Sequence, residues 1–174
     1  QDTALKLIEA GANVNTKGDY GETPLTLALA NGNVALTARL LKAGADPKVT
    51  RWNGETALMI AADAGSAEEV KLLLDAGLDV TAAESEKGQT ALMWAAVEGH
   101  PGVVDLLIQR GANVNAVTKK GFTPLTFATM KNDSPSIQLL VKAGADPNYA
   151  LPDKAQTKML LVAAAYDSTE AAIA

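Results

Sequence analysis

A period of about 33 residues dominates this sequence and constrains its fold more than any other feature. One series of glycines, each after an apolar run, has spacings of 33, 33, 34 and 33 residues: Gly11, Gly44, Gly77, Gly111 and Gly144. A second series has spacings of 33, 34 and 33 residues: Gly21, Gly54, Gly88 and Gly121. Such a period is typical of stacked repeat units. Both series place one extra residue between Gly77 and Gly88, which indicates a loop insertion and helices of constant length.

Each unit has the pattern of two short helices. The pair Thr23-Pro24 predicts the start of a first helix, because threonine caps free backbone N–H groups and proline suits the first helical position. Gly32 predicts the end of that helix in a left-handed conformation. In a later unit, the segment 66–69 (Ser-Ala-Glu-Glu) resembles a capping box that opens a second helix. Such short helices are marginal alone, so packing between units must hold them.

Several motifs recur at these positions. They are Gly-Glu-Thr-Pro-Leu at 21–25, Gly-Phe-Thr-Pro-Leu at 121–125, and Gly-Ala-Asn-Val-Asn at 11–15 and 111–115. Together they resemble the ankyrin repeat, over about residues 2–174. The resemblance implies an all-α solenoid of stacked helix-turn-helix units with β-hairpin-like loops, which we call fingers.

The period also divides the chain. We expect a single domain over residues 1–174, with a partial repeat at 1–17, full repeats at 18–50, 51–83, 84–117 and 118–150, and a partial repeat at 151–174. Eight leucines should be buried: Leu25, Leu40, Leu58, Leu73, Leu92, Leu107, Leu125 and Leu140. Trp94 should also join the core, because it occupies the position of Leu27, Ile60 and Phe127.

The sequence departs from the family pattern at two positions. The histidine that usually follows Thr-Pro-Leu is replaced by Thr26, Met59, Met93 and Thr126. The aspartate that often opens the finger is missing at Gly18, Arg51, Ser85 and Thr118. We expect the threonines to bond locally and the methionines to fill the interior.

Composition narrows the function classes. The chain has no cysteine and one histidine, His100, so thiolate metal sites, a cysteine nucleophile and histidine-rich metal sites are excluded. A formal net charge of −5 argues against a nucleic-acid partner, and the apolar runs are far too short to span a membrane. We therefore expect a soluble protein that is not an enzyme and binds no cofactor. The lack of cysteine suits a bacterial chain or an oxidising compartment, and localisation stays open.

The polar residues that could suggest catalysis have simpler interpretations. Glu68 and Glu69 fit the first turn of a helix, where the helix dipole favours negative charge, better than they fit a catalytic pair. His100 precedes Pro101 at a turn between two helices, and the resemblance implies a structural role for it there.

The resemblance implies a non-catalytic protein-interaction module that presents finger tips and the concave face of the first helices to a protein partner. By position, the candidate contact residues are Tyr20, Trp52, Asn53, Lys87, Gln89, Lys120 and Phe122 on the fingers, with Val97 and Met130 on the helices. Trp52 stands out at a turn tip, where it either contacts a partner or lies on the neighbouring finger. The alternatives are a structural or assembly element that stacks end to end, and a regulatory fragment of a larger protein.

The two ends of the sequence hold incomplete units. Apolar surface is expected at Ala4, Leu7 and Ile8, and at Met159, Leu160 and Ile173. Because a repeat unit cannot bury its apolar face alone, we expect further repeats in a longer array or end-to-end self-association.

Overall fold

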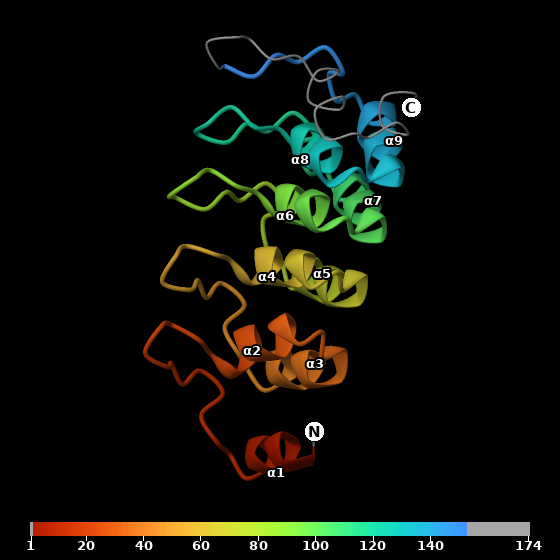
Figure 1. Ribbon diagram of the computed structural model, residues 1–174. Coiled ribbons are helices and arrows are strands. Elements are labelled where there is room, and N and C mark those ends of the chain that lie inside the picture. The colour runs from red at the N-terminus through yellow and green to blue at the C-terminus, as the bar shows by residue number, and fades with distance from the viewer. Residues whose placement is uncertain (1, 153–174) are drawn as a thin grey trace. The chain divides into compact units, whose positions relative to one another are not determined.

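A computed structural model of the chain describes residues 2–152, which form nine α-helices joined by extended fingers (Figure 1). The described chain divides into two compact units. The first ends at Asp79 and the second begins at Val80.

The first unit contains five helices. They are α1 (Asp2–Glu9), α2 (Pro24–Ala30), α3 (Val34–Lys42), α4 (Ala57–Asp63) and α5 (Ala67–Asp75). Helix α2 pairs with α3, and α4 pairs with α5, to make the two helices of each repeat. Between repeats, α2 packs on α4, and α3 packs on both α1 and α5. First helices therefore stack on first helices, and second helices on second helices (Figure 1).

The second unit repeats this arrangement with four helices. They are α6 (Ala91–Glu98), α7 (Pro101–Gln109), α8 (Pro124–Lys131) and α9 (Ser134–Lys142). Helix α6 contacts α7 and α8, and α9 contacts α7 and α8. The predicted helix-turn-helix units and their stacking are confirmed for the described part of the chain.

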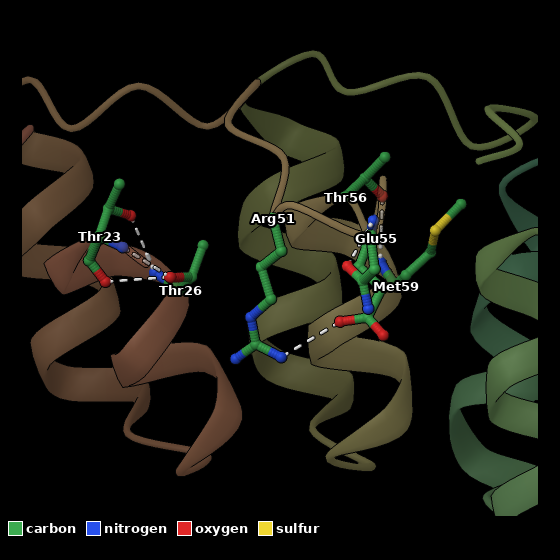
Figure 2. A network of polar contacts seen from close by, with 7 residues as sticks. Thr23, Thr26, Arg51, Glu55, Thr56 and Met59 are labelled. Carbon is green, nitrogen blue, oxygen red and sulfur yellow. Dashed lines mark hydrogen bonds and ion pairs between the residues drawn. The ribbon is translucent and has the colours of Figure 1, made fainter. Parts of the chain in front are cut away.

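The first helices begin where the sequence predicts. The four capping threonines each accept a hydrogen bond from the backbone N–H three residues later: Thr23, Thr56, Thr90 and Thr123. Thr26 returns this bond, since its Oγ1 accepts from the Thr23 N–H at 2.8 Å (Figure 2), and Thr126 does the same for Thr123. Met59 and Met93, at the same position in the middle repeats, are buried. Local bonding by threonine and interior packing by methionine are thus both confirmed.

The second helices show where the capping prediction was incomplete. Ser66 Oγ accepts from the Glu69 N–H at 3.4 Å, as a capping box requires. The Glu69 carboxyl group, however, points across to α3, where Thr37 Oγ1 donates to its Oε1 at 2.7 Å. Glu69 is therefore a buried bridge between repeats as well as a first-turn residue.

The core is built from the predicted leucines. All eight of them are buried, and buried alanines such as Ala61 and Ala95 also belong to the core. The prediction for Trp94 holds only in part, because this side chain is half-buried while its Nε1 atom is fully buried. The reason is that its position is not uniformly interior: Ile60 is 4% exposed, whereas Leu27 is 51% exposed.

Asparagine side chains tie successive repeats together on the loops. Asn15 donates from Nδ2 to the Gly44 carbonyl oxygen at 3.0 Å, and its Oδ1 accepts from the Asp46 N–H at 2.8 Å. Asn115 makes the same two contacts in the second unit, with Gly144 at 3.1 Å and Asp146 at 3.3 Å. The Gly-Ala-Asn-Val-Asn motif thus ends in a residue that docks the next repeat.

The expected apolar surface is present at the first helix. Leu7 on α1 is 55% exposed, and Ala4 and Ile8 are half-buried. At the other end, the partial repeat expected at 151–174 lies outside the described residues beyond its first two positions, and so do Met159, Leu160 and Ile173. Within residues 2–152, no helix has the length and apolar character needed to cross a membrane.

Candidate interaction surface

Each repeat projects one finger, closed by the same backbone hydrogen bond. In the first three fingers it runs from the N–H of Gly18 to Glu22 O (2.8 Å), Arg51 to Glu55 O (3.0 Å) and Glu84 to Gln89 O (2.9 Å). In the fourth finger Thr118 N–H donates to Phe122 O at 2.9 Å. The third finger therefore holds the extra residue of the 33-residue period. The insertion predicted between Gly77 and Gly88 lies in the finger tip.

The third finger corrects one prediction from sequence. Its opening position is held by Glu84, not Ser85, because the longer turn shifts the pairing by one residue. The Glu84 carboxylate accepts from the backbone N–H groups of Glu86 (2.6 Å), Lys87 (2.7 Å) and Gln89 (2.9 Å). Burial alone would raise the pKa of Glu84, but these backbone hydrogen bonds outweigh it and lower the pKa below its ordinary value. An acidic residue thus does hold this turn.

The other fingers are each stabilised by a different side-chain contact. In the first, Glu22 Oε2 accepts from the Tyr20 N–H at 3.0 Å. In the second, Arg51 and Glu55 form an ion pair at 3.2 Å (Figure 2). In the fourth, Thr118 Oγ1 accepts from the Phe122 N–H at 2.9 Å. These contacts take the place of the aspartate that often opens the finger and is missing here.

Within each unit the two fingers are also bonded to one another. In the first unit the Trp52 N–H donates to the Tyr20 carbonyl oxygen at 3.3 Å. In the second unit Lys119 donates from its N–H to Lys87 O at 2.8 Å and from Nζ to Ser85 O at 2.6 Å. Each unit therefore presents a pair of linked tips rather than two independent loops.

The candidate residues of the first unit lie on this linked pair. Trp52 is 73% exposed and Tyr20 is 65% exposed. Most of the Trp52 surface is thus open to solvent, which disfavours the shielding interpretation. Asn53 is half-buried and has a structural task, since its Oδ1 accepts from the Glu55 N–H at 3.2 Å.

The candidate residues of the second unit differ in character. Lys87 and Lys120 are exposed, whereas Gln89, Val97 and Met130 are half-buried. Phe122 is not a free anchor, because its ring stacks on Phe127 of α8 with centroids 5.7 Å apart. The structure thus brings Tyr20 together with Trp52, and Lys87 together with the fourth finger, in separate units.

The first unit also has a surface feature that its sequence pattern does not predict. An open depression of about 450 Å³ lies beside the first finger, and its lining includes Asp19, Tyr20, Glu22, Pro24 and Leu27. Leu27 occupies the helical position that led us to expect Trp94 in the core, yet it is 51% exposed. The exposure of Leu27 depends on which residues pack over the start of α2, and the sequence pattern of a single repeat does not indicate those residues.

The buried Glu69 is the other residue whose environment was missed. Burial raises its pKa above the ordinary value, and the hydrogen bonds from Thr37 and Ser66 oppose that rise. Its partner Thr37 lies 32 residues away, one repeat earlier. Among residues 2–152 no group of three or more His, Cys, Asp or Glu side chains could hold a metal ion.

Comparison with known proteins agrees with the repeat architecture. A family model of ankyrin repeats in three copies matches residues 1–84, 27–118 and 81–150. No curated protein matches the sequence.

Proposed function

The chain belongs to the ankyrin repeat family, and from that premise we propose that it is a non-catalytic protein-interaction module. Ankyrin repeats are generally protein–protein interaction modules, and the family confirms the all-α repeat fold. In our proposal, the finger tips and the concave face of the first helices contact a protein partner. Fold alone does not specify that partner.

The observation that carries the proposal is the exposure of Trp52 on a finger that is hydrogen-bonded to its neighbour. Tryptophan and tyrosine are the commonest anchors of protein interfaces. Here Trp52 and Tyr20 are both largely exposed, and a backbone hydrogen bond links their fingers. Such a support lowers the conformational entropy that a partner would otherwise have to remove on binding.

The proposed contact surface has two parts, one on each unit. In the first unit it consists of Tyr20, Trp52 and Asn53, with Trp52 as the principal anchor. In the second unit it consists of Lys87, Gln89, Val97, Lys120, Phe122 and Met130. Lys87 and Lys120 would contribute mainly to orientation and association rate, because exposed charges add little affinity.

The proposal can be tested by site-specific photocrosslinking in cells of the source organism. A benzophenone amino acid replaces Trp52 in one variant and the exposed Lys71 of α5 in the control. We expect a discrete protein adduct from position 52 and none from position 71. The adduct should form again between the purified chain and the purified captured protein. Equal adducts at both positions, or none at position 52, would contradict the proposal.

A second candidate function is an assembly element that associates end to end or docks further repeats. It is favoured by the exposed Leu7, which lines an apolar groove of about 240 Å³ with residues of α1, α2 and α3. Sedimentation velocity over a concentration series tests it, with Leu7→Glu as the variant. Concentration-dependent association that Leu7→Glu abolishes would support this candidate, and a monomer at all concentrations would exclude self-association.

A further inference from the structure

We propose that the depression beside the first finger binds a cationic side chain of the partner, flanked by an apolar one, in an extended segment. This inference deepens the function proposed above and rests on it. It concerns only the first unit, where the depression lies between the finger at 18–22 and the start of α2.

The size and lining of the depression suit side chains rather than a whole domain. Its volume of about 450 Å³ falls within the roughly 300–1,000 Å³ of clefts that hold small ligands. Leu27 and Tyr20 line it with apolar and aromatic surface, and both remain largely open to solvent. An exposed leucine beside an exposed tyrosine on an ordered scaffold is an apolar contact surface for a partner.

The charge of the lining residues indicates that the ligand carries a positive charge. Asp19 and Glu22 contribute two carboxylates, and the lining contains no basic side chain. The hydrogen bond from the Tyr20 N–H holds the Glu22 carboxylate in place at 3.0 Å. A guanidinium or ammonium group placed here would have two acidic residues and a tyrosine among its neighbours, and carboxylates and aromatic rings both attract cations. A phosphate-bearing ligand would be repelled.

The repeat at 118–150 provides an internal comparison. The residues 100 positions later than Asp19 and Tyr20 are Lys119 and Lys120, so the charge at the tip is reversed. The residues 100 positions later than Glu22 and Leu27 are Phe122 and Phe127, whose rings stack on each other. The equivalent surface there is covered by the chain's own aromatic pair. The acidic, open version is therefore not general to the fold.

The experiment uses the full chain and a defined probe. The probe is an end-blocked octapeptide of alternating arginine and leucine, and its matched partner replaces every arginine by citrulline, which has the same shape without charge. Binding is followed by backbone amide shifts and by calorimetry. We expect shifts at residues 18–27 and at least tenfold weaker binding of the citrulline peptide.

Variants of the chain test the assigned residues. Asp19→Asn combined with Glu22→Gln keeps the hydrogen-bond acceptor for Tyr20 and removes both charges, and it should weaken binding of the arginine peptide at least tenfold. Glu68→Gln removes an exposed carboxylate of α5 that lies outside the proposed contact surface, so it is the control and should change affinity less than twofold. Circular dichroism should show both variants folded.

Three results would overturn the inference. They are equal affinity for the arginine and citrulline peptides, amide shifts that lie outside residues 18–27, and no binding of either peptide. The crosslinking test at position 52 does not use these peptides. An adduct there without arginine selectivity in the peptide test would therefore remove this inference and leave the proposed function intact.

Discussion

The hydroxyl group of Thr37 on α3 donates a 2.7 Å hydrogen bond to Oε1 of Glu69 on α5, and both side chains are fully buried. This bond links the second helices of adjacent repeats. The other carboxyl oxygen, Oε2, is buried and makes no hydrogen bond with the described residues. A buried carboxylate with one unsatisfied oxygen costs free energy. Burial of Glu69 therefore costs least when the carboxyl group is protonated, although the Thr37 hydrogen bond itself favours the carboxylate.

The first prediction concerns pH and Glu69. Burial raises the pKa of Glu69 in the folded state, so its stabilising contribution is complete below the unfolded pKa and is lost as pH rises through the folded pKa. Glu69→Gln, which is uncharged at every pH, should be more stable than the wild type at pH 7. That difference should shrink near pH 4, as measured by urea unfolding at both pH values. Glu68→Gln, on the exposed neighbour, is the control.

The second prediction concerns Glu84 and has the opposite sign. Because backbone hydrogen bonds lower its folded pKa, Glu84 stabilises the chain above the unfolded pKa, and this contribution is lost as pH falls through the folded pKa. Glu84→Gln should lower the free energy of unfolding at pH 7 by about 1.5–3 kcal/mol, typical for hydrogen bonds to a charged group. The exposed Glu86→Gln is the control. A loss that persists unchanged in strong acid would refute the electrostatic explanation.

The third prediction tests the core. Leu73 on α5 is completely buried, so Leu73→Ala should lower the free energy of unfolding by about 2–5 kcal/mol through lost burial and a cavity. Leu7→Ala removes the same atoms from a 55% exposed side chain and should cost much less. Denaturant unfolding measures both, and a loss below about 1 kcal/mol for Leu73→Ala would contradict the packing described above.

The fourth prediction concerns Trp52. Once a partner that binds the finger tips is captured, Trp52→Ala should weaken its binding by about 2 kcal/mol or more. The free energy of unfolding should change by far less, because 73% of the side chain is already exposed. Calorimetry and thermal unfolding on the same variant separate the two effects. If stability falls and affinity stays the same, Trp52 supports the fingers and does not anchor a partner.

Local features of the fold and the stacking of repeats could be predicted from the sequence, and the individual side-chain contacts between repeats could not. The capping threonines and the buried leucines follow from patterns within one repeat, since a cap needs only the next three residues. Glu69 looked like an ordinary first-turn acid because its partner, Thr37, belongs to the preceding repeat. The helical position shared by Leu27 and Ile60 differs in burial between repeats, with Leu27 51% exposed and Ile60 4% exposed, and the apolar pattern is the same in both.

The candidate site shows the same division. The finger positions of Tyr20 and Trp52 follow from the glycine series, and their exposure agrees with the prediction. The stacking of Phe122 on Phe127 depends on side-chain packing between a finger and α8, which spacing does not encode. Glu84 was overlooked because the inserted residue was placed in the loop without deciding on which side of the turn it falls.

The contacts of Asn15 and Asn115 have a consequence for how such a chain can change during evolution. Each asparagine bonds a glycine carbonyl oxygen and the N–H of a residue two positions later, and both of these groups belong to the backbone. These hydrogen bonds between repeats therefore depend very little on which side chains the next repeat carries. Duplication or loss of a whole repeat preserves these hydrogen bonds, whereas an insertion or deletion of a few residues breaks them. Selection can then alter the exposed tips of a copied unit while its attachment to its neighbour stays the same.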